Sequence, residues 1–231
     1  EVPDIGNDPN NYFKYIDGNG FFERVSLAQE DTDRSKYYNE NKKRDDAKTK
    51  FQSQDAFLES LQMHGKVSLF DDVYIERITQ LINKTNQFNL TTKRYSLAEV
   101  IKIQDDPSFI AFYGKLEDKF GDNGLISVLI ANKDIDTIHI DTWLMSCRVL
   151  KRGMEFAMFN ALLEEAKKLK ITKIVGHFIP TEKNMMVKSL YSHLGFTLTS
   201  ESDQEDIYTL DVVTEVKVKH HIEIIENFTE T

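Results

Sequence analysis

The sequence predicts an α/β fold in which a mixed, mostly antiparallel central sheet is flanked by helices. Strand-like and helix-like periods alternate from residue 138 to residue 196, a hairpin signal lies at residues 121–124, and capped amphipathic helices precede it. A chain of 231 residues with 40% hydrophobic side chains can bury one good core and carry a small appendage. We therefore expect one domain over residues 51–231 and a helical appendage over residues 1–50.

The first 50 residues differ in texture from the rest. A short helix is predicted at residues 8–17, because "NDPNNYF" offers an N-cap followed by proline at the first helical position. Residues 27–50 are highly charged and predict a second helix with a largely solvated surface.

Elements of the main domain follow in order. Residues 51–61 predict a short helix, and residues 63–70 alternate like a first strand. Asp71 and Asp72 are candidate caps for an amphipathic helix, and Ser96 with Glu99 three residues later forms a capping box for the next one.

Three strands are then predicted. Residues 109–120 and 125–133 are joined by "GDNG", whose Asn and Gly accept positive φ and favour a hairpin turn. Residues 138–146 continue this antiparallel meander. The period of two places Asp141, Trp143 and Cys147 on one face of the third strand.

The C-terminal half predicts alternating helices and strands. Gly153 opens a long helix with one apolar stripe, and the elements after it are a strand at residues 173–178, a helix at 183–194, strands at 207–213 and 216–225, and a loose tail at 227–231.

The junction between the third strand of the meander and the long helix predicts an anion site. The first N–H groups of a helix have no partner within it, and three cations lie close by in the sequence. The residues that contribute are Cys147, Arg148, Val149, Lys151, Arg152 and Gly153. The alternative is that the lysine and arginines are solvated helix-start residues.

Cys147 is a candidate nucleophile, because a neighbouring cation and a helix N-terminus both stabilise a thiolate. His139 and His177 fall on strands predicted to be adjacent, and either is a candidate base. The alternative for Cys147 is a small buried hydrophobe, as most free cysteines are.

Composition narrows the class of partner. A formal net charge of −9 argues against a general nucleic-acid binder. One cysteine cannot form an intramolecular disulfide, and no apolar run or signal peptide predicts a membrane association, so we expect a cytoplasmic protein. No metal site is predicted.

The strand, helix, strand, helix order with a basic, Gly-containing turn resembles the GNAT superfamily of acyltransferases. Asn184, Tyr191, Gly195 and Phe196 match the family's N-x6-Y-x3-GF pattern. The resemblance implies that the turn holds the pyrophosphate of coenzyme A or a carrier-bound phosphopantetheine, that Asn184 binds the pantetheine, and that Tyr191 protonates the leaving thiolate. The alternatives are a helix cap for Asn184 and a packing residue for Tyr191.

In a GNAT-like fold the polar run after residue 82 lies over the acceptor side of the cleft. This placement predicts substrate contacts for Asn86, Asn89 and Thr91, or else a loop that satisfies its own backbone. Further expected substrate contacts are His139, Asp141 and Trp143.

Four longer strings resemble the FkbH-like family: "LINKTNQFNLTTKRY" from Leu81, "KFGDNGLISVLI" from Lys119, "IDTWLMSCRVLKRGME" from Ile140 and "IPTEKNMMV" from Ile179. That family joins a HAD-type phosphatase domain to a GNAT-like domain. Here the resemblance covers the GNAT-like part, and we expect residues 1–50 to be an appendage or a linker from a HAD-type domain whose catalytic part is absent.

The FkbH-like resemblance implies transfer of a (phospho)glyceryl group from a phosphorylated three-carbon acyl donor to an acyl carrier protein. A HAD-type phosphatase domain is a further expected partner. Two alternatives stay open: an acetyl-CoA-dependent N-acetyltransferase, and a non-catalytic module that docks a carrier protein or a phosphatase.

Overall fold

The computed structural model describes residues 29–212 and 218–225. The chain divides into two compact units, Glu1–Asp45 and Asp46–Thr231. Helix α2 (Gln29–Lys48) corresponds to the charge-rich helix predicted at residues 27–50. The helix predicted at residues 8–17 and the predicted tail lie outside the described residues.

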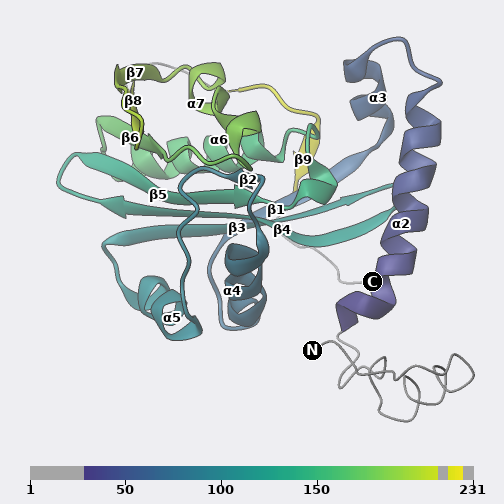
Figure 1. Ribbon diagram of the computed structural model, residues 1–231, viewed down its shortest axis with the longest axis horizontal. Helices are drawn as coiled ribbons and strands as arrows, with labels where there is room; N and C mark the ends of the chain where they lie inside the picture. The colour runs from purple at the N-terminus through teal and green to yellow at the C-terminus, as the bar shows by residue number, and fades with distance from the viewer. Residues whose placement is uncertain (1–28, 213–217, 226–231) are drawn as a thin grey trace, which may run out of the picture. The chain divides into compact units, whose positions relative to one another are not determined.

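Nine strands of the described chain form one sheet (Figure 1). Its order is β7-β8-β6-β5-β4-β3-β1-β9, with β2 attached to β5. Only the β5–β6 and β1–β9 pairs among the described strands are parallel, so the predicted mixed, mostly antiparallel sheet is confirmed. The bounds are β1 Met63–Leu69, β2 Phe88–Asn89, β3 Phe109–Asp118, β4 Gly121–Lys133, β5 Thr137–Met145, β6 Lys173–Phe178, β7 Thr197–Ser200, β8 Asp206–Asp211 and β9 Ile222–Ile224.

Helices cover both faces of the sheet. In Figure 1, α4 and α5 lie on one face, and α6 and α7 lie on the other. The predicted capping box of Ser96 and Glu99 is present at the start of α5. The bounds are α3 Gln54–Ser60, α4 Ile75–Lys84, α5 Leu97–Asp105, α6 Met154–Lys168 and α7 Leu190–His193, with short 3-10 helices η2 Cys147–Val149 and η3 Met185–Val187.

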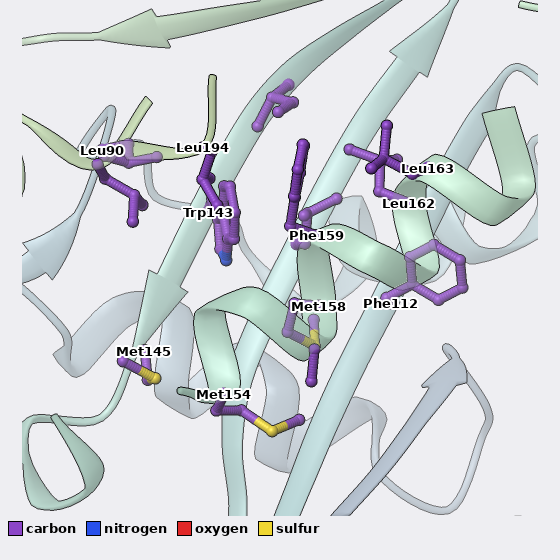
Figure 2. Close-up of a cluster of buried hydrophobic side chains, with 14 of the residues drawn as sticks. Leu90, Phe112, Trp143, Met145, Met154, Met158, Phe159, Leu162, Leu163 and Leu194 are labelled. Atoms are coloured by element: carbon purple, nitrogen blue, oxygen red, sulfur yellow. The ribbon is translucent and has the colours of Figure 1, made fainter. Parts of the chain in front are cut away.

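Two hydrophobic clusters hold these layers together. The larger lies between the sheet and α6 and α7 and includes Trp143, Met158 and Phe159 (Figure 2). The smaller joins α4 and α5 to the other face through residues such as Ile78 and Val100. Each large side chain buried in this way contributes about 1.5–3 kcal/mol, so the two clusters fix the strands that carry the site.

The β3–β4 hairpin turns earlier than predicted. Strand β3 ends at Asp118 and β4 begins at Gly121, so the turn consists of residues 119–120 and not of "GDNG". The Asp118 carboxylate accepts a hydrogen bond from the Phe120 amide at 2.9 Å and so stabilises the tighter turn. Gly124, with a φ of 67°, instead occupies an irregular part of β4.

A bulge in β5 overturns the predicted shared face of Asp141, Trp143 and Cys147. Ala131 pairs with Ile140 and Ile130 pairs with Thr142, so Asp141 is an extra residue in the strand. The insertion reverses the alternation beyond it. Trp143 therefore packs in the larger cluster while Asp141 faces the other side of the sheet.

Two further elements differ from those predicted. The helix predicted at residues 183–194 is divided into η3 and α7, with a break at residues 188–189. Strand β7 was not predicted, because all four of its side chains are exposed and show no apolar alternation.

Candidate functional site

The candidate site lies where β5 and β6 separate. The two strands pair in parallel from Thr137 and Lys173 to Ile140 and Gly176, and the pairing stops there. Beyond that point residues 88–92, here called the bridging segment, lie between them. The Leu90 amide donates to the Trp143 carbonyl at 3.0 Å, and the Ile179 amide donates to the Leu90 carbonyl at 2.8 Å.

A pocket of about 190 Å³ opens beside this split. His139 and His177 project into it from β5 and β6, with ring centroids 5.9 Å apart and planes inclined by 29°. The prediction that these two histidines lie on adjacent strands is therefore confirmed. We call this pocket the histidine pocket; its lining residues are Thr91, Lys93, Asn132, His139, Ile140, Asp141, His177, Ile179 and Glu205.

Glu205 orients His177. The His177 Nδ1 atom lies 2.8 Å from a Glu205 carboxylate oxygen. Because an ionised carboxylate only accepts hydrogen bonds, this contact places the proton on Nδ1 and leaves the lone pair of the neutral ring on Nε2. An imidazole held in this way can accept a proton from a bound molecule.

The Asp141 carboxylate is held in place in the same pocket. Its carboxylate accepts hydrogen bonds from Lys93, Tyr95 and Thr142, and Lys93 forms an ion pair with it. Burial raises the pKa of Tyr95 far above its ordinary value, and the hydrogen bond to Asp141 adds to the effect. Tyr95 is therefore a hydrogen-bond donor to Asp141 over the whole neutral range.

Tyr191 and Trp143 lie on the buried side of the split. Both are fully buried in the larger cluster, and neither lines the histidine pocket. Burial raises the pKa of Tyr191 far above its ordinary value, and the nearby backbone amide of His177 opposes only part of this effect. In this conformation Tyr191 packs in the core, as the alternative prediction held, and Trp143 is not open to a substrate.

Asn184 holds the chain's own backbone. Its side-chain amide donates to the Asn89 carbonyl at 2.8 Å and to the Ile179 carbonyl at 2.9 Å, and its oxygen accepts from the Thr181 amide at 2.7 Å. The expected pantetheine contact of Asn184 is thus replaced by a contact with the bridging segment.

The predicted polar loop is divided between two roles. Asn89 is buried and bonds to its own neighbours, accepting from the Thr92 amide at 2.8 Å, and exposed Asn86 accepts from Arg94. Both satisfy local groups, as the alternative prediction held. Thr91 lines the histidine pocket and donates to the Asp141 carbonyl at 2.9 Å.

The turn after β5 differs from the predicted anion site in two residues. The Arg152 guanidinium is buried and pairs with Asp118 at 3.1 Å, so it holds the β3–β4 hairpin and does not face a ligand. The Val149 side chain is buried, and its amide donates to the Ser146 carbonyl at 3.2 Å.

Among the other residues of the turn, Cys147, Arg148 and Lys151 are nearer to solvent, whereas Gly153 is buried. Cys147 is exposed, so the alternative of a buried hydrophobe is wrong for it. Arg148 donates to the Ser146 hydroxyl at 3.2 Å. Lys151 is exposed, and Gly153 has a φ of 87°, a left-handed conformation that glycine adopts without strain.

Glu155 lies where an anionic ligand of the α6 N-terminus would be expected. It lines a second pocket, of about 300 Å³, together with Lys151 and Gly153. Burial raises the pKa of its carboxyl, and the backbone N–H groups of Gly153 and Glu155 oppose this effect. The chain thus supplies its own carboxyl to these amides.

Taken together, the described conformation does not fit the arm of coenzyme A or phosphopantetheine. The bridging segment fills the space between β5 and β6, Asn184 is committed to it, and Glu155 occupies the helix N-terminus. No group of three or more His, Cys, Asp or Glu side chains suited to a metal ion occurs in the described part of the chain.

Sequence reasoning missed the partners of the pocket's main groups. Glu205, Lys93 and Tyr95 are separated from the residues they contact by 28, 48 and 46 positions. No local spacing connects them, and only the pairing of β6 with β8 and of β2 with β5 brings them together.

No protein-family model and no curated protein sequence matches the chain. Solved structures match its fold. The ribosomal-protein-S18-alanine N-acetyltransferase from Escherichia coli has a TM-score of 0.50 and 13% identity over 64% of this chain and 94% of that one. A domain from Methanocaldococcus jannaschii has a TM-score of 0.51 and 12% identity over 64% and 99%.

A protein assigned to the GNAT acetyltransferase family from Desulfovibrio desulfuricans has a TM-score of 0.51 and 10% identity over 65% of this chain and 99% of its own. These similarities show that the chain has a GNAT-like fold, as predicted. Among the described helices, none combines the length and apolar character that crossing a bilayer requires.

Proposed function

We propose that this domain is a GNAT-type acyltransferase that acylates an amine bound in the histidine pocket. The observation that carries the proposal is the His177–Glu205 pair, which presents a ring nitrogen beside the split between β5 and β6. The GNAT-like fold supports acyl transfer as the reaction class, and a similar structure bears the name of an N-acetyltransferase.

The charge of the pocket favours an amine. Asp141 and Glu205 contribute two carboxylates and Lys93 one ammonium, so the lining has an excess of negative charge when the histidines are neutral. An acceptor ammonium would be attracted by this charge and then lose a proton to His177. The acyl group would come from a thioester substrate, whose carbon–sulfur bond breaks as the carbon–nitrogen bond forms. The leaving thiolate would take up the proton that the acylated nitrogen releases.

A transfer assay tests this proposal. The full chain is incubated with labelled acetyl-CoA and a panel of small amines and peptides, and acylated products are identified by mass spectrometry. His177→Gln should lower the rate about a hundredfold or more, because a well-placed general base typically contributes that much. Wild-type protein that acylates no amine, or His177→Gln with full activity, would reject the assignment.

The FkbH-like resemblance supplies a second candidate, (phospho)glyceryl transfer to an acyl carrier protein. Exposure of Cys147 favours it, since a reachable thiol can take an acyl group as a thioester and pass it to a carrier thiol. Intact mass after exposure to a phosphoglyceryl donor distinguishes the two. A covalent adduct that is absent from Cys147→Ser supports this candidate, and amine acylation that survives Cys147→Ser supports the first.

A further inference from the structure

The bridging segment separates the two sides of the candidate site. Leu90 is fully buried and belongs to the same cluster as Trp143 and Leu194 (Figure 2). Thr91, the next residue, lines the histidine pocket. The side chains of two consecutive residues therefore divide the pocket from the core beneath the split.

Two buried polar groups on the core side of the bridging segment lack a hydrogen-bond acceptor. Neither Trp143 Nε1 nor the Tyr191 O–H finds an acceptor among the described residues, although both side chains are fully buried, and the His177 amide near Tyr191 can only donate. Their rings pack edge to face with centroids 6.3 Å apart. Buried N–H and O–H groups are normally paired, so this pair points to a ligand with acceptor atoms.

The bridging segment also carries backbone strain at its C-terminal end. Thr92 has a φ of 54°, a left-handed conformation that is unfavourable for a β-branched residue. The Asn89 side chain holds it there by accepting from its amide at 2.8 Å. Strain of this kind is kept only where surrounding contacts impose it, and it lowers the cost of moving the segment away.

We propose that the bridging segment is an internal occupant of the acyl-donor site, and that a thioester arm binds between β5 and β6 by displacing it. The arm's carbonyl oxygens would accept hydrogen bonds from Trp143 and Tyr191. Asn184 would exchange the Asn89 carbonyl for a carbonyl of the arm. This inference rests on the proposed acyltransferase function and explains why the described conformation does not fit the arm.

Displacement of the segment makes apparent affinity for the acyl donor depend on how firmly the segment is held. The affinity is reduced by the fraction of molecules in which the site is open. Weakening the contacts of Leu90 should therefore tighten binding, although Leu90 would not touch the ligand.

The only tryptophan of the chain provides a direct probe. In the full-length protein, acetyl-CoA should shift the single indole N–H resonance of Trp143 in a saturable manner. Acetyl-CoA should also speed hydrogen exchange at the amides of Leu90 and Ile179, whose hydrogen bonds join the bridging segment to the two sides of the split. Acetyl-CoA that binds by calorimetry but leaves all three signals unchanged would overturn the inference.

Variants test the competition. Leu90→Ala should bind acetyl-CoA at least about tenfold more tightly than wild type, because it removes a buried side chain from the closed state only. Leu162→Ala is the matched control, since Leu162 is an equally buried leucine of the same cluster on α6. It should be destabilised without tighter binding.

Thr91→Val is a milder variant in case Leu90→Ala does not fold. It removes the hydrogen bond to the Asp141 carbonyl and should tighten binding about threefold. Unchanged or weaker binding in the folded Leu90 or Thr91 variants, or no binding in any of the proteins, rejects the inference.

The outcomes also separate this inference from the proposed function. A response of Trp143 to acetyl-CoA with no acylated amine would reject the function and leave the displacement standing. Acylated amine together with a Trp143 resonance that acetyl-CoA leaves unchanged would reject the displacement and leave the function standing.

Discussion

Glu155 shows how one side chain changes what a helix N-terminus can bind. Its carboxyl is partly desolvated in the first turn of α6, one oxygen has no hydrogen-bond partner among the described residues, and its pKa is raised by burial. A group whose pKa is higher in the folded than in the unfolded chain binds its proton more tightly when folded. Its contribution is therefore present at low pH and is lost as pH rises through the folded-state pKa.

Glu155→Gln should accordingly make the protein more stable at neutral pH. Glutamine keeps the shape but carries no charge that burial can penalise. The gain in unfolding free energy should shrink as the pH falls from the raised folded-state pKa of Glu155 toward the ordinary glutamate value of 4.5, because below that value the Glu155 carboxyl is neutral in both the folded and the unfolded chain. Urea unfolding of both proteins across this range measures it, and a gain that grows toward acid pH would contradict the assignment.

Thr92 provides a second test at the scale of one residue. Thr92→Gly should stabilise the fold by about 1 kcal/mol, because glycine adopts a φ of 54° without the Cβ clash. Thr92→Ala keeps the Cβ and serves as the control that should bring no such gain. Equal effects of the two substitutions in urea unfolding would show that the backbone is not strained.

Prediction from sequence succeeded for some site residues and not for others, for a physical reason. His139 and His177 were expected to be neighbours because each lies in a strongly patterned strand of one βαβ unit. Glu205 lies in a short polar connection between β7 and β8, where no periodicity fixes which side chain faces the pocket. Arg152 and Asn184 carried the right chemistry for a ligand but found partners within the chain.

Among the elements, the β3–β4 hairpin depends on one buried ion pair. The side chain of Asp118 is 0% exposed and that of Arg152 is 10% exposed. Arg152 also donates to Asn123 at 3.3 Å and to the Arg148 carbonyl at 3.0 Å, and so ties the hairpin to η2.

Removing one partner of this pair should be strongly destabilising. Arg152→Met should cost about 3–5 kcal/mol, because it leaves the Asp118 carboxylate buried without its cation. Adding Asp118→Asn to Arg152→Met should recover most of that loss, since asparagine keeps the acceptor for the turn without the charge. Chemical denaturation of both variants tests this, and equal losses in the single and double variants would show that charge is not the cause.

Strand β5 shows why element boundaries are predicted better than faces. Its ends were placed within one residue, but the single-residue bulge at Asp141 inverted the faces after it. The bulge depends on pairing with β4, and the letters of β5 alone contain no sign of it. This inversion puts Trp143 in the core and leaves Asp141 for the histidine pocket.

At the scale of the whole domain, the GNAT-like order of elements could be predicted because each change of period marks a layer of the fold. The two-residue strand β2 could not, because its position depends on pairing with Met145 and Leu144 more than fifty residues away. That pairing closes the split between β5 and β6. Long-range contacts of this kind therefore decide how the split is filled.

The proposed reaction uses groups on both faces of the sheet. The histidine pocket lies on one side of the sheet, and the unpaired Trp143 and Tyr191 groups lie on the other. The split is the place where an acyl group and an acceptor could meet. We propose that His177 and Glu205 act there as one unit, with His177 as the base and Glu205 as its positioning residue.

The most direct measurement of that claim is the rate of amine acylation in His177→Gln, Glu205→Gln and the double variant, compared with wild type. If Glu205 acts only through His177, Glu205→Gln should lower the rate about tenfold in wild type and cause no further loss in the His177→Gln background. A loss of the same size in both backgrounds, or no loss in either, would contradict the account.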